Sequence, residues 1–280
     1  MIINRSQPVT DSDQFAETQK KDLSLEQKSE ILRKYIYKKY TSDVIRYANT
    51  SMHNTKQPVS KHIDSMIAFA WSAAGEITNQ LLGPNRPSDS PQQRWYENFL
   101  LKLECLIYVH DLDEAGMKED YTALATHKDP KLKRLKQEQS EVTIEKLAKI
   151  HGSWVLDLWK EAELCKTPEA KLVRILDRAE SAQFMINKEE FSNMKSLRDV
   201  EPHAYKMTSE EINLSIQKLL DSVKLLDKKD TPLIETAKGW VLASFGRYEN
   251  VCGNRWTQKK EHEQTLAEIE KNWETWNLKY

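Results

Sequence analysis

Residues 99–114 read FLLKLECLIYVHDLDE, an apolar stretch that runs directly into a group of polar side chains. The apolar residues recur at three- and four-residue spacing, the pattern of one buried face of an α-helix: Phe99, Leu103, Leu106 and Ile107. His110, Asp111 and Glu114 follow directly. Burying an imidazole and two carboxylates is costly unless they are paired or bind a metal. The stretch therefore predicts a helix whose C-terminal end presents reactive groups inside the protein.

The composition of the whole chain favours an all-α fold. Its 280 residues include only 7 Gly and 9 Pro, fewer turn residues than strand-rich folds use. The 42 Lys and Arg balance 43 Asp and Glu, so we expect no strong nucleic-acid binding and no attraction to anionic membranes. Residues 66–71, the longest apolar run, are too few for a membrane span, and the N-terminus lacks a signal-peptide core. We expect a cytoplasmic protein.

Local helix signals divide the chain into three parts. Residues 1–23 are polar and aperiodic, which predicts a flexible N-terminal arm. Ser24 to Gln27 forms a capping box that begins the first helix, and Thr167-Pro168 begins another that runs to about residue 190. Residues 118–131 are predicted to be a polar excursion without a helix. A second capping box at Thr208 to Glu211 predicts a boundary, after which residues 208–280 form a helical extension packed on the domain at 25–190.

Two more polar residues lie on apolar helical faces elsewhere in the chain. His62 shares a face with Met66 and Phe69, and Asp177 lies within LVRILDRAE at 172–180. Each residue alone is compatible with a satisfied core histidine or a packing salt bridge. Together with His110 and Asp111 they offer two nitrogens and two oxygens, a set that suits a divalent first-row metal. The other histidines have polar neighbours and are predicted to lie on the surface: His53, His127, His151, His203 and His262.

The order of these motifs resembles that of the HD-domain phosphohydrolases. The chain lacks the common nucleotide-binding, zinc-protease and nucleophile-elbow motifs. It has instead VSKH at 59–62, YVHDLDE at 108–114, LWKEAE at 158–163 and EAKLVRILDRAE at 169–180. These runs are similar to the 5′-deoxynucleotidase-like branch over residues 25–190. The resemblance implies an all-α bundle that holds one divalent cation between helices, with the C-terminal extension lying outside the resemblance.

The resemblance also implies roles for individual residues. The metal ligands would be His62, His110, Asp111 and Asp177, and Glu114 would transfer a proton. Arg46 would face the substrate phosphate and Tyr47 would border the nucleoside. The family's Gly-Asp pair after the acid is absent, so Glu119 or Asp120 would take over sugar recognition. The identity of the metal stays open among Mn, Co, Fe, Mg and Zn.

The activity implied is removal of the 5′-phosphate from a (deoxy)nucleoside monophosphate. Two alternatives stay open at this point. One is a deoxynucleoside triphosphate triphosphohydrolase, or another nucleotide phosphoesterase, that uses the same site. The other is a non-catalytic HD scaffold for binding or assembly. The expected partner is a nucleotide or another small phosphoester, and the branch also implies a homodimer.

Overall fold

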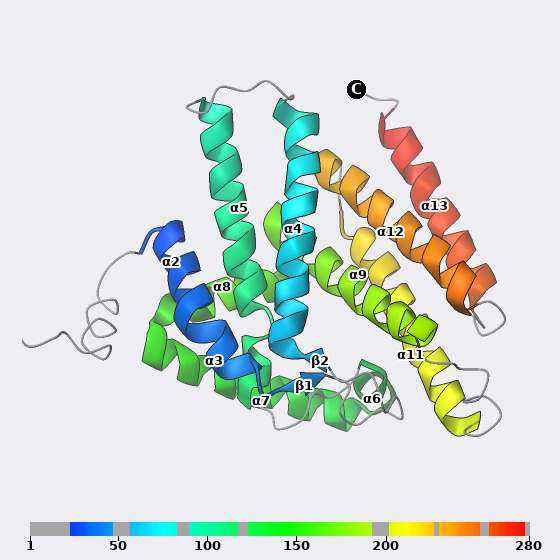
Figure 1. The fold of residues 1–280 in the computed structure, drawn as a ribbon, viewed down its shortest axis with the longest axis horizontal. Coiled ribbons are helices and arrows are strands. Elements are labelled where there is room, and N and C mark those ends of the chain that lie inside the picture. Colours follow the sequence, from blue (N-terminus) through cyan, green and yellow to red (C-terminus); the bar gives the residue numbers. More distant parts are fainter. Residues whose placement is uncertain are drawn as a thin grey trace, which may run out of the picture.

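The computed structural model describes residues 23–46, 57–82, 90–116, 123–191, 202–226, 230–252 and 258–277, and its fold is all-α (Figure 1). Within these ranges the extended structure is confined to β1 (Ile45–Arg46) and β2 (Gln57–Pro58). The two form an antiparallel pair with Ile45 opposite Pro58. The predicted fold class is therefore confirmed.

The N-terminal helical segment begins as the sequence predicts. Ser24 Oγ accepts a hydrogen bond from Gln27 N at 3.3 Å, and Gln27 Oε1 accepts one from Ser24 N at 3.0 Å, which completes the capping box. Three consecutive elements follow: α2 (Leu25–Ile31), the π-helical η1 (Leu32–Ile36) and α3 (Tyr37–Thr41). α2 packs on α5, so this segment covers one side of the central helices.

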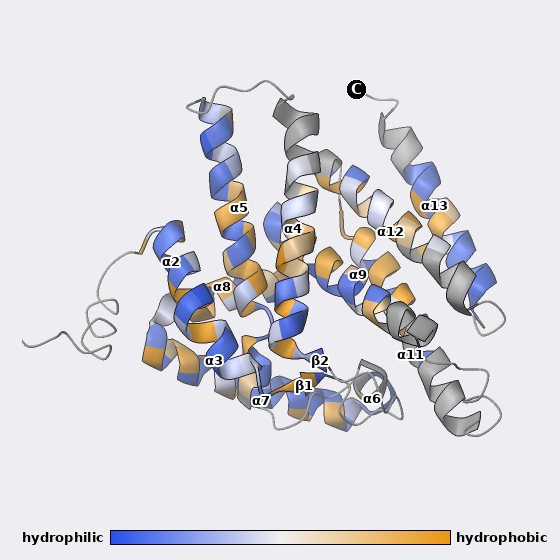
Figure 2. Cartoon of the chain, in the orientation of Figure 1, coloured by the Kyte–Doolittle hydropathy of each residue, from blue (hydrophilic) through white to orange (hydrophobic). Residues whose placement is uncertain are grey.

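Two long helices, α4 (Val59–Leu82) and α5 (Pro91–Val109), pack side by side (Figure 1). The first turns of α5 are mostly hydrophilic and its later turns carry apolar residues (Figure 2). Phe99, Leu103, Leu106 and Ile107 are at most 5% exposed. The apolar face predicted from their spacing is thus buried, and His110 follows at the C-terminal end of the same helix.

A short 3₁₀-helix, η2 (Leu112–Gly116), follows α5, and three further α-helices come next: α6 (Ala123–Lys128), α7 (Pro130–His151) and α8 (Ser153–Leu164). The prediction of a polar excursion without a helix over 118–131 is wrong for α6, which is too short and polar to show a clear period. Gly152 separates α7 from α8 with φ +109°, a conformation that side-chain-bearing residues rarely adopt. A Cβ there would also lie 2.7 Å from the Trp154 ring.

The remaining helices are arranged around α9 (Pro168–Phe191). α9 contacts α4, α5 and α8, and it also contacts α11 (Pro202–Val223) and α12 (Thr231–Cys252), while α13 (Lys259–Asn277) packs on α11 (Figure 1). The helix start predicted at Thr208 is wrong, because α11 begins at Pro202. Proline suits a first helical position, since its missing N–H has no partner there anyway. The division into a domain at 25–190 and an extension at 208–280 stays a prediction.

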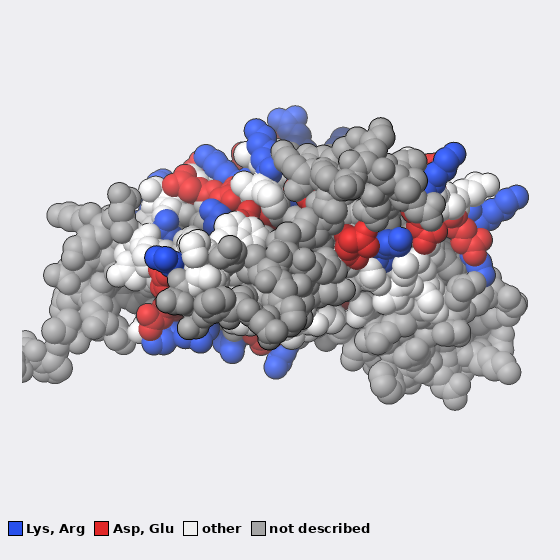
Figure 3. Space-filling view, turned by 90° about the horizontal axis from the view of Figure 1, so that it is seen from above, with Lys and Arg blue, Asp and Glu red and all other residues white. Residues whose placement is uncertain are grey.

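One continuous apolar cluster joins the N-terminal and C-terminal helices. Leu106, Ile175, Leu219 and Val241 belong to it and are fully buried. Burying a side chain of this size stabilises the fold by about 1.5–3 kcal/mol. Within the described residues, each helix is either too short or too polar to cross a membrane. On the face seen in Figure 3, the described Lys and Arg side chains are interspersed with Asp and Glu.

Two histidines that we predicted on the surface are buried. His151 is 6% exposed and its Nε2 lies 3.1 Å from Tyr40 Oη, while His262 is 1% exposed and packs edge-on against the Phe245 ring. Burial, together with the charge of Lys39, lowers the pKa of His151 to about 4. The surface prediction failed because both histidines lie on helices that are mostly polar, so their sequence neighbours do not reveal the one face that is buried. His127 is exposed, as predicted.

Candidate metal centre

Three residues predicted as metal ligands converge from three different helices. His62 lies in the first turn of α4, His110 caps the end of α5, and Asp177 lies in the middle of α9. One ligand atom from each lies within 4.8 Å of the others. All three residues are buried, with 0%, 8% and 6% of their surface exposed. The contacts of α9 with α4 and α5 therefore create the cluster.

Asp111, the fourth predicted ligand, lies against both imidazoles. Its Oδ2 is 3.1 Å from His110 Nε2 and 3.5 Å from His62 Nε2, and its side chain is 18% exposed. Asp177 Oδ1 approaches the same His62 Nε2 at 3.3 Å. Asp111 is thus the solvent-facing member of the set, and the structure brings all four predicted ligands to one place.

The imidazole nitrogens of this cluster are suited to hold a cation. His62 Nε2 and His110 Nε2 are both buried, and neither makes a hydrogen bond of acceptable geometry. Buried polar atoms in native proteins nearly always have such a partner. Two such nitrogens beside two carboxylates are the mixed N and O donor set that binds Zn²⁺, Mn²⁺, Fe²⁺ or Co²⁺. The residues present therefore fit a divalent cation.

The other nitrogen of each imidazole is held by a protein acceptor. His110 Nδ1 donates to the Ile107 carbonyl at 2.7 Å, and His62 Nδ1 donates to Glu180 Oε2 at 2.5 Å. Such bonds fix the tautomer and the ring orientation of metal-binding histidines. Both rings are consequently locked with Nε2 facing the cluster.

Glu180 contacts the cluster, and the sequence prediction missed it. It is 3% exposed, and besides His62 it accepts hydrogen bonds from Gln57 Nε2 at 2.9 Å and Arg46 Nη1 at 3.4 Å. Burial alone would raise its pKa, but the His62 and Arg46 charges and the Gln57 hydrogen bond together lower it. The only signal in the sequence is its position three residues after Asp177, on the same side of a helix.

The electrostatics of the cluster indicate an excess of negative charge. Burial alone would raise the pKa values of Asp111 and Asp177. The nearby charge of His110 instead holds the pKa of Asp111 well below its usual range. The charges of Arg178 and His62 do the same for the pKa of Asp177. Burial would lower the pKa of His110, but the Asp111 and Asp177 carboxylates outweigh it and raise the pKa to about 9. A proton on His110 thus offsets the carboxylates, and a divalent cation would take over that role.

Glu114 is buried beside the cluster, but not in the predicted geometry. We expected it one turn beyond His110 on the same α-helix, whereas α5 ends at Val109 and Glu114 lies in η2. Its backbone N–H donates to the Asp111 carbonyl at 3.1 Å, and its Oε1 accepts from Lys136 Nζ on α7 at 3.1 Å. Lys136 was missed because no local pattern links residues so far apart in the sequence.

Asp113, the acid that directly precedes Glu114 in the chain, has a different environment from Glu114. Its Oδ1 accepts a hydrogen bond from Trp159 Nε1 at 3.3 Å. Burial raises its pKa to about 6 even though a hydrogen bond from Ser140 acts in the opposite direction. Asp113 therefore contacts α7 and α8 through Ser140 and Trp159.

The predicted substrate-binding residues divide into one that the structure places and three that it does not describe. Arg46 is buried on β1, donates to Ser181 Oγ at 2.8 Å, and lies 4.0 Å from Asp177 Oδ1. It therefore lies beside the cluster. Tyr47, Glu119 and Asp120 lie outside the described residues, as do residues 1–22 of the arm predicted at 1–23.

Comparison with known families agrees with this site. The family model of the HD domain matches residues 91–219, a segment that contains His110, Asp111, Glu114 and Asp177. His62 and Arg46 lie before the matched segment. No curated protein and no solved structure matches the chain. The match and the all-α fold support an HD-domain family for this chain, and proteins of that family are generally metal-dependent hydrolases.

Proposed function

We propose that this protein is a divalent-metal-dependent phosphohydrolase that removes the 5′-phosphate from (deoxy)nucleoside monophosphates. The observation that carries the proposal is the pair of buried Nε2 atoms, on His62 and His110, that face Asp111 and Asp177. The match to the HD domain supports the hydrolase class. The choice of a nucleoside monophosphate rests on the resemblance of residues 158–180 to the 5′-deoxynucleotidase-like branch.

The four ligand residues would hold the cation and define where the phosphate binds. A bound divalent cation supplies Lewis-acid polarisation of a phosphate oxygen and lowers the pKa of water. Arg46 adds positive charge next to Asp177, and its planar guanidinium suits phosphate oxygens. The expected result is a phosphate group oriented toward the Asp111 side, where the cluster meets solvent.

Glu114 would carry the proton during hydrolysis. Water attacks the phosphorus atom, the bond between phosphorus and the nucleoside 5′ oxygen breaks, and the departing oxygen needs a proton. Glu114 accepts a proton from the water and returns one to that oxygen, which yields a nucleoside and inorganic phosphate. Lys136 orients the Glu114 carboxylate through its ammonium group. Proton transfer by a positioned side chain typically contributes about 10²–10⁴ in rate.

Phosphate release from a panel of nucleoside mono- and triphosphates, with Mn²⁺, Co²⁺ or Mg²⁺, tests the proposal. Glu114→Gln should retain metal and fold yet hydrolyse its best substrate at least about a hundredfold more slowly. Asp111→Ala should lose both metal and activity. Glu138→Gln, at an exposed acid on α7, is the matched control and should behave as the wild type.

Each other outcome assigns a different function. Near wild-type turnover by Glu114→Gln would move the proton-transfer role to Asp113, Glu119 or Asp120. Release of triphosphate from deoxynucleoside triphosphates would favour the triphosphohydrolase alternative. A metal-loaded wild type that hydrolyses no nucleotide with any of the three metals would favour the scaffold.

A further inference from the structure

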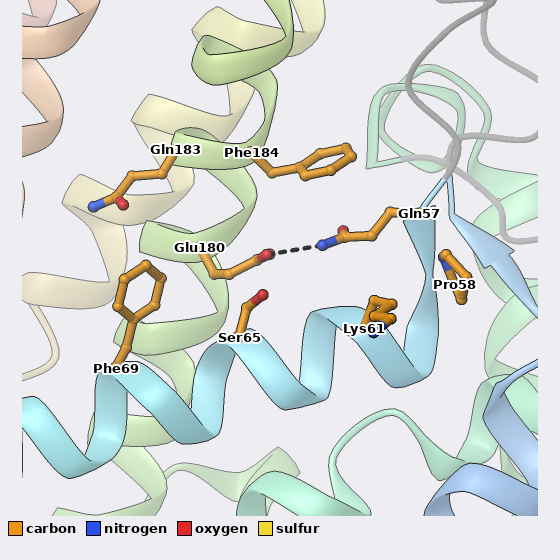
Figure 4. A pocket seen from close by; sticks show the side chains of 8 residues that line it. All are labelled: Gln57, Pro58, Lys61, Ser65, Phe69, Glu180, Gln183 and Phe184. Carbon is orange, nitrogen blue, oxygen red and sulfur yellow. Dashed lines mark hydrogen bonds between the residues drawn. The ribbon is translucent and has the colours of Figure 1, made fainter.

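A cavity of about 380 Å³, open to solvent, lies next to the candidate metal centre, between α4 and α9 (Figure 4). Glu180 lines this cavity and also binds His62 Nδ1, the ring nitrogen that faces away from the metal cluster. The Glu180 carboxylate therefore stands between the cavity and the His62 ring, whose Nε2 faces the other predicted ligands. None of the four predicted metal ligands is among the residues that line the cavity, which makes it distinct from the proposed hydrolysis site.

The lining of the cavity combines apolar rings with unused hydrogen-bonding groups. Phe69 comes from α4 and Phe184 from α9, on either side of Glu180 (Figure 4). Lys61, Ser65 and Gln183 also line it, and their side chains make no hydrogen bond or ion pair with the described residues. An ammonium, a hydroxyl and an amide therefore line one space with their donors and acceptors available.

Glu180 does not make the cavity a cation site, because its charge is already compensated. Its carboxylate accepts hydrogen bonds from His62, Gln57 and Arg46. Among the described residues that line the cavity, the uncompensated charge is the ammonium of Lys61, which is an exposed residue. The charge and the rings together favour a ligand that has an anionic group and a flat aromatic part.

We propose that this cavity is a second ligand site, for a planar heterocycle that carries an anionic group, which is the chemistry of a nucleoside monophosphate. The Phe69 and Phe184 rings would contact the base, the Gln183 amide and the Ser65 hydroxyl would bind its polar edge, and Lys61 would pair with the phosphate. The volume lies within the range of small-molecule sites. The proposal concerns binding alone and does not depend on any hydrolytic activity.

Binding of adenosine 5′-monophosphate to the chelator-treated full-length protein tests the site, because removing the cation removes hydrolysis. Calorimetry and saturation-transfer NMR measure the dissociation constant. Phe184→Ala and Lys61→Ala should each weaken binding about tenfold, as loss of a stacking ring or a phosphate partner does. Phe184→Leu keeps an apolar side chain if the alanine variant is unstable, and it should weaken binding in the same direction.

Two controls make the result specific to the cavity. Trp71→Ala removes an exposed aromatic ring from the same helix, α4, and Lys160→Ala removes an exposed cation from α8. Both should bind adenosine 5′-monophosphate as the wild type does. The proposal is overturned if the wild type shows no binding at millimolar nucleotide, if the cavity variants bind with unchanged affinity, or if the control variants lose affinity equally.

Discussion

Replacing Glu180 with alanine should weaken the affinity for a divalent cation by about 10–100-fold, although Glu180 is not itself a predicted ligand. The carboxylate holds His62 through the 2.5 Å hydrogen bond to Nδ1. His62 is 0% exposed, so water cannot easily replace the lost acceptor. Without it, the imidazole is no longer locked with Nε2 toward Asp177.

The size of this effect follows from the number and kind of contacts that are lost. Glu180 accepts from Gln57 Nε2 at 2.9 Å and from Arg46 Nη1 at 3.4 Å as well as from His62. A 10–100-fold change in affinity corresponds to about 1.4–2.8 kcal/mol. Glu180→Gln should fall between the wild type and alanine, because the glutamine Oε1 can still accept from His62 Nδ1 but carries no charge.

Competition with a chromogenic chelator for Co²⁺ or Mn²⁺ measures these affinities directly. Glu138→Ala is the matched control, because it removes an exposed carboxylate that pairs with Arg134 on its own helix. Circular dichroism of each variant confirms that the fold is intact. A folded Glu180→Ala protein that binds Co²⁺ as tightly as the wild type would show that Glu180 does not position His62.

Three other perturbations have defined outcomes. Lys136→Met should slow phosphate release about tenfold while metal content stays unchanged, because Glu114 loses the cation that orients it. Lys171→Met should lower the free energy of unfolding by about 3–5 kcal/mol in urea titrations, because the fully buried Asp230 carboxylate loses its 2.6 Å ion pair. As a control, Lys160→Met should change the free energy of unfolding by less than about 0.5 kcal/mol. The wild type should lose stability as the pH falls from 6.5 to about 4, because in this range the unfolded chain protonates His151 and the folded protein does not. His151→Gln should reduce the dependence of the free energy of unfolding on pH in the same range.

Local chemistry made much of the helical fold predictable. The Ser24 capping box and the Thr167-Pro168 start depend only on neighbouring residues, and both precede helices at the expected places. Thr208 has the same kind of signal and lies inside α11. A capping side chain competes with continuation of the helix, and the contacts of α11 with α9 favour continuation. Propensity alone cannot settle that competition.

The metal centre was predictable to the extent that its residues interrupt apolar patterns. His62, His110 and Asp177 are conspicuous because each lies where a helix face is otherwise hydrophobic. Glu180 and Lys136 lie among other charged residues, so nothing in the pattern distinguishes them. Their roles arise from packing of α9 on α4 and of α7 on η2, which brings together residues far apart in the sequence.

The position of α9 has a consequence for the protein without its cation. Asp177 and Glu180 belong to a helix that is covered by α4, α5 and α8 and also by α11 and α12. We therefore expect apolar packing, not a cation, to build the scaffold of the candidate metal centre, unlike in small zinc domains that unfold without metal. Backbone amide protons in the middle of α9 should exchange with deuterium only through global unfolding. Stripping the metal should leave this protection in place, and a preformed cluster would then rebind the cation without refolding.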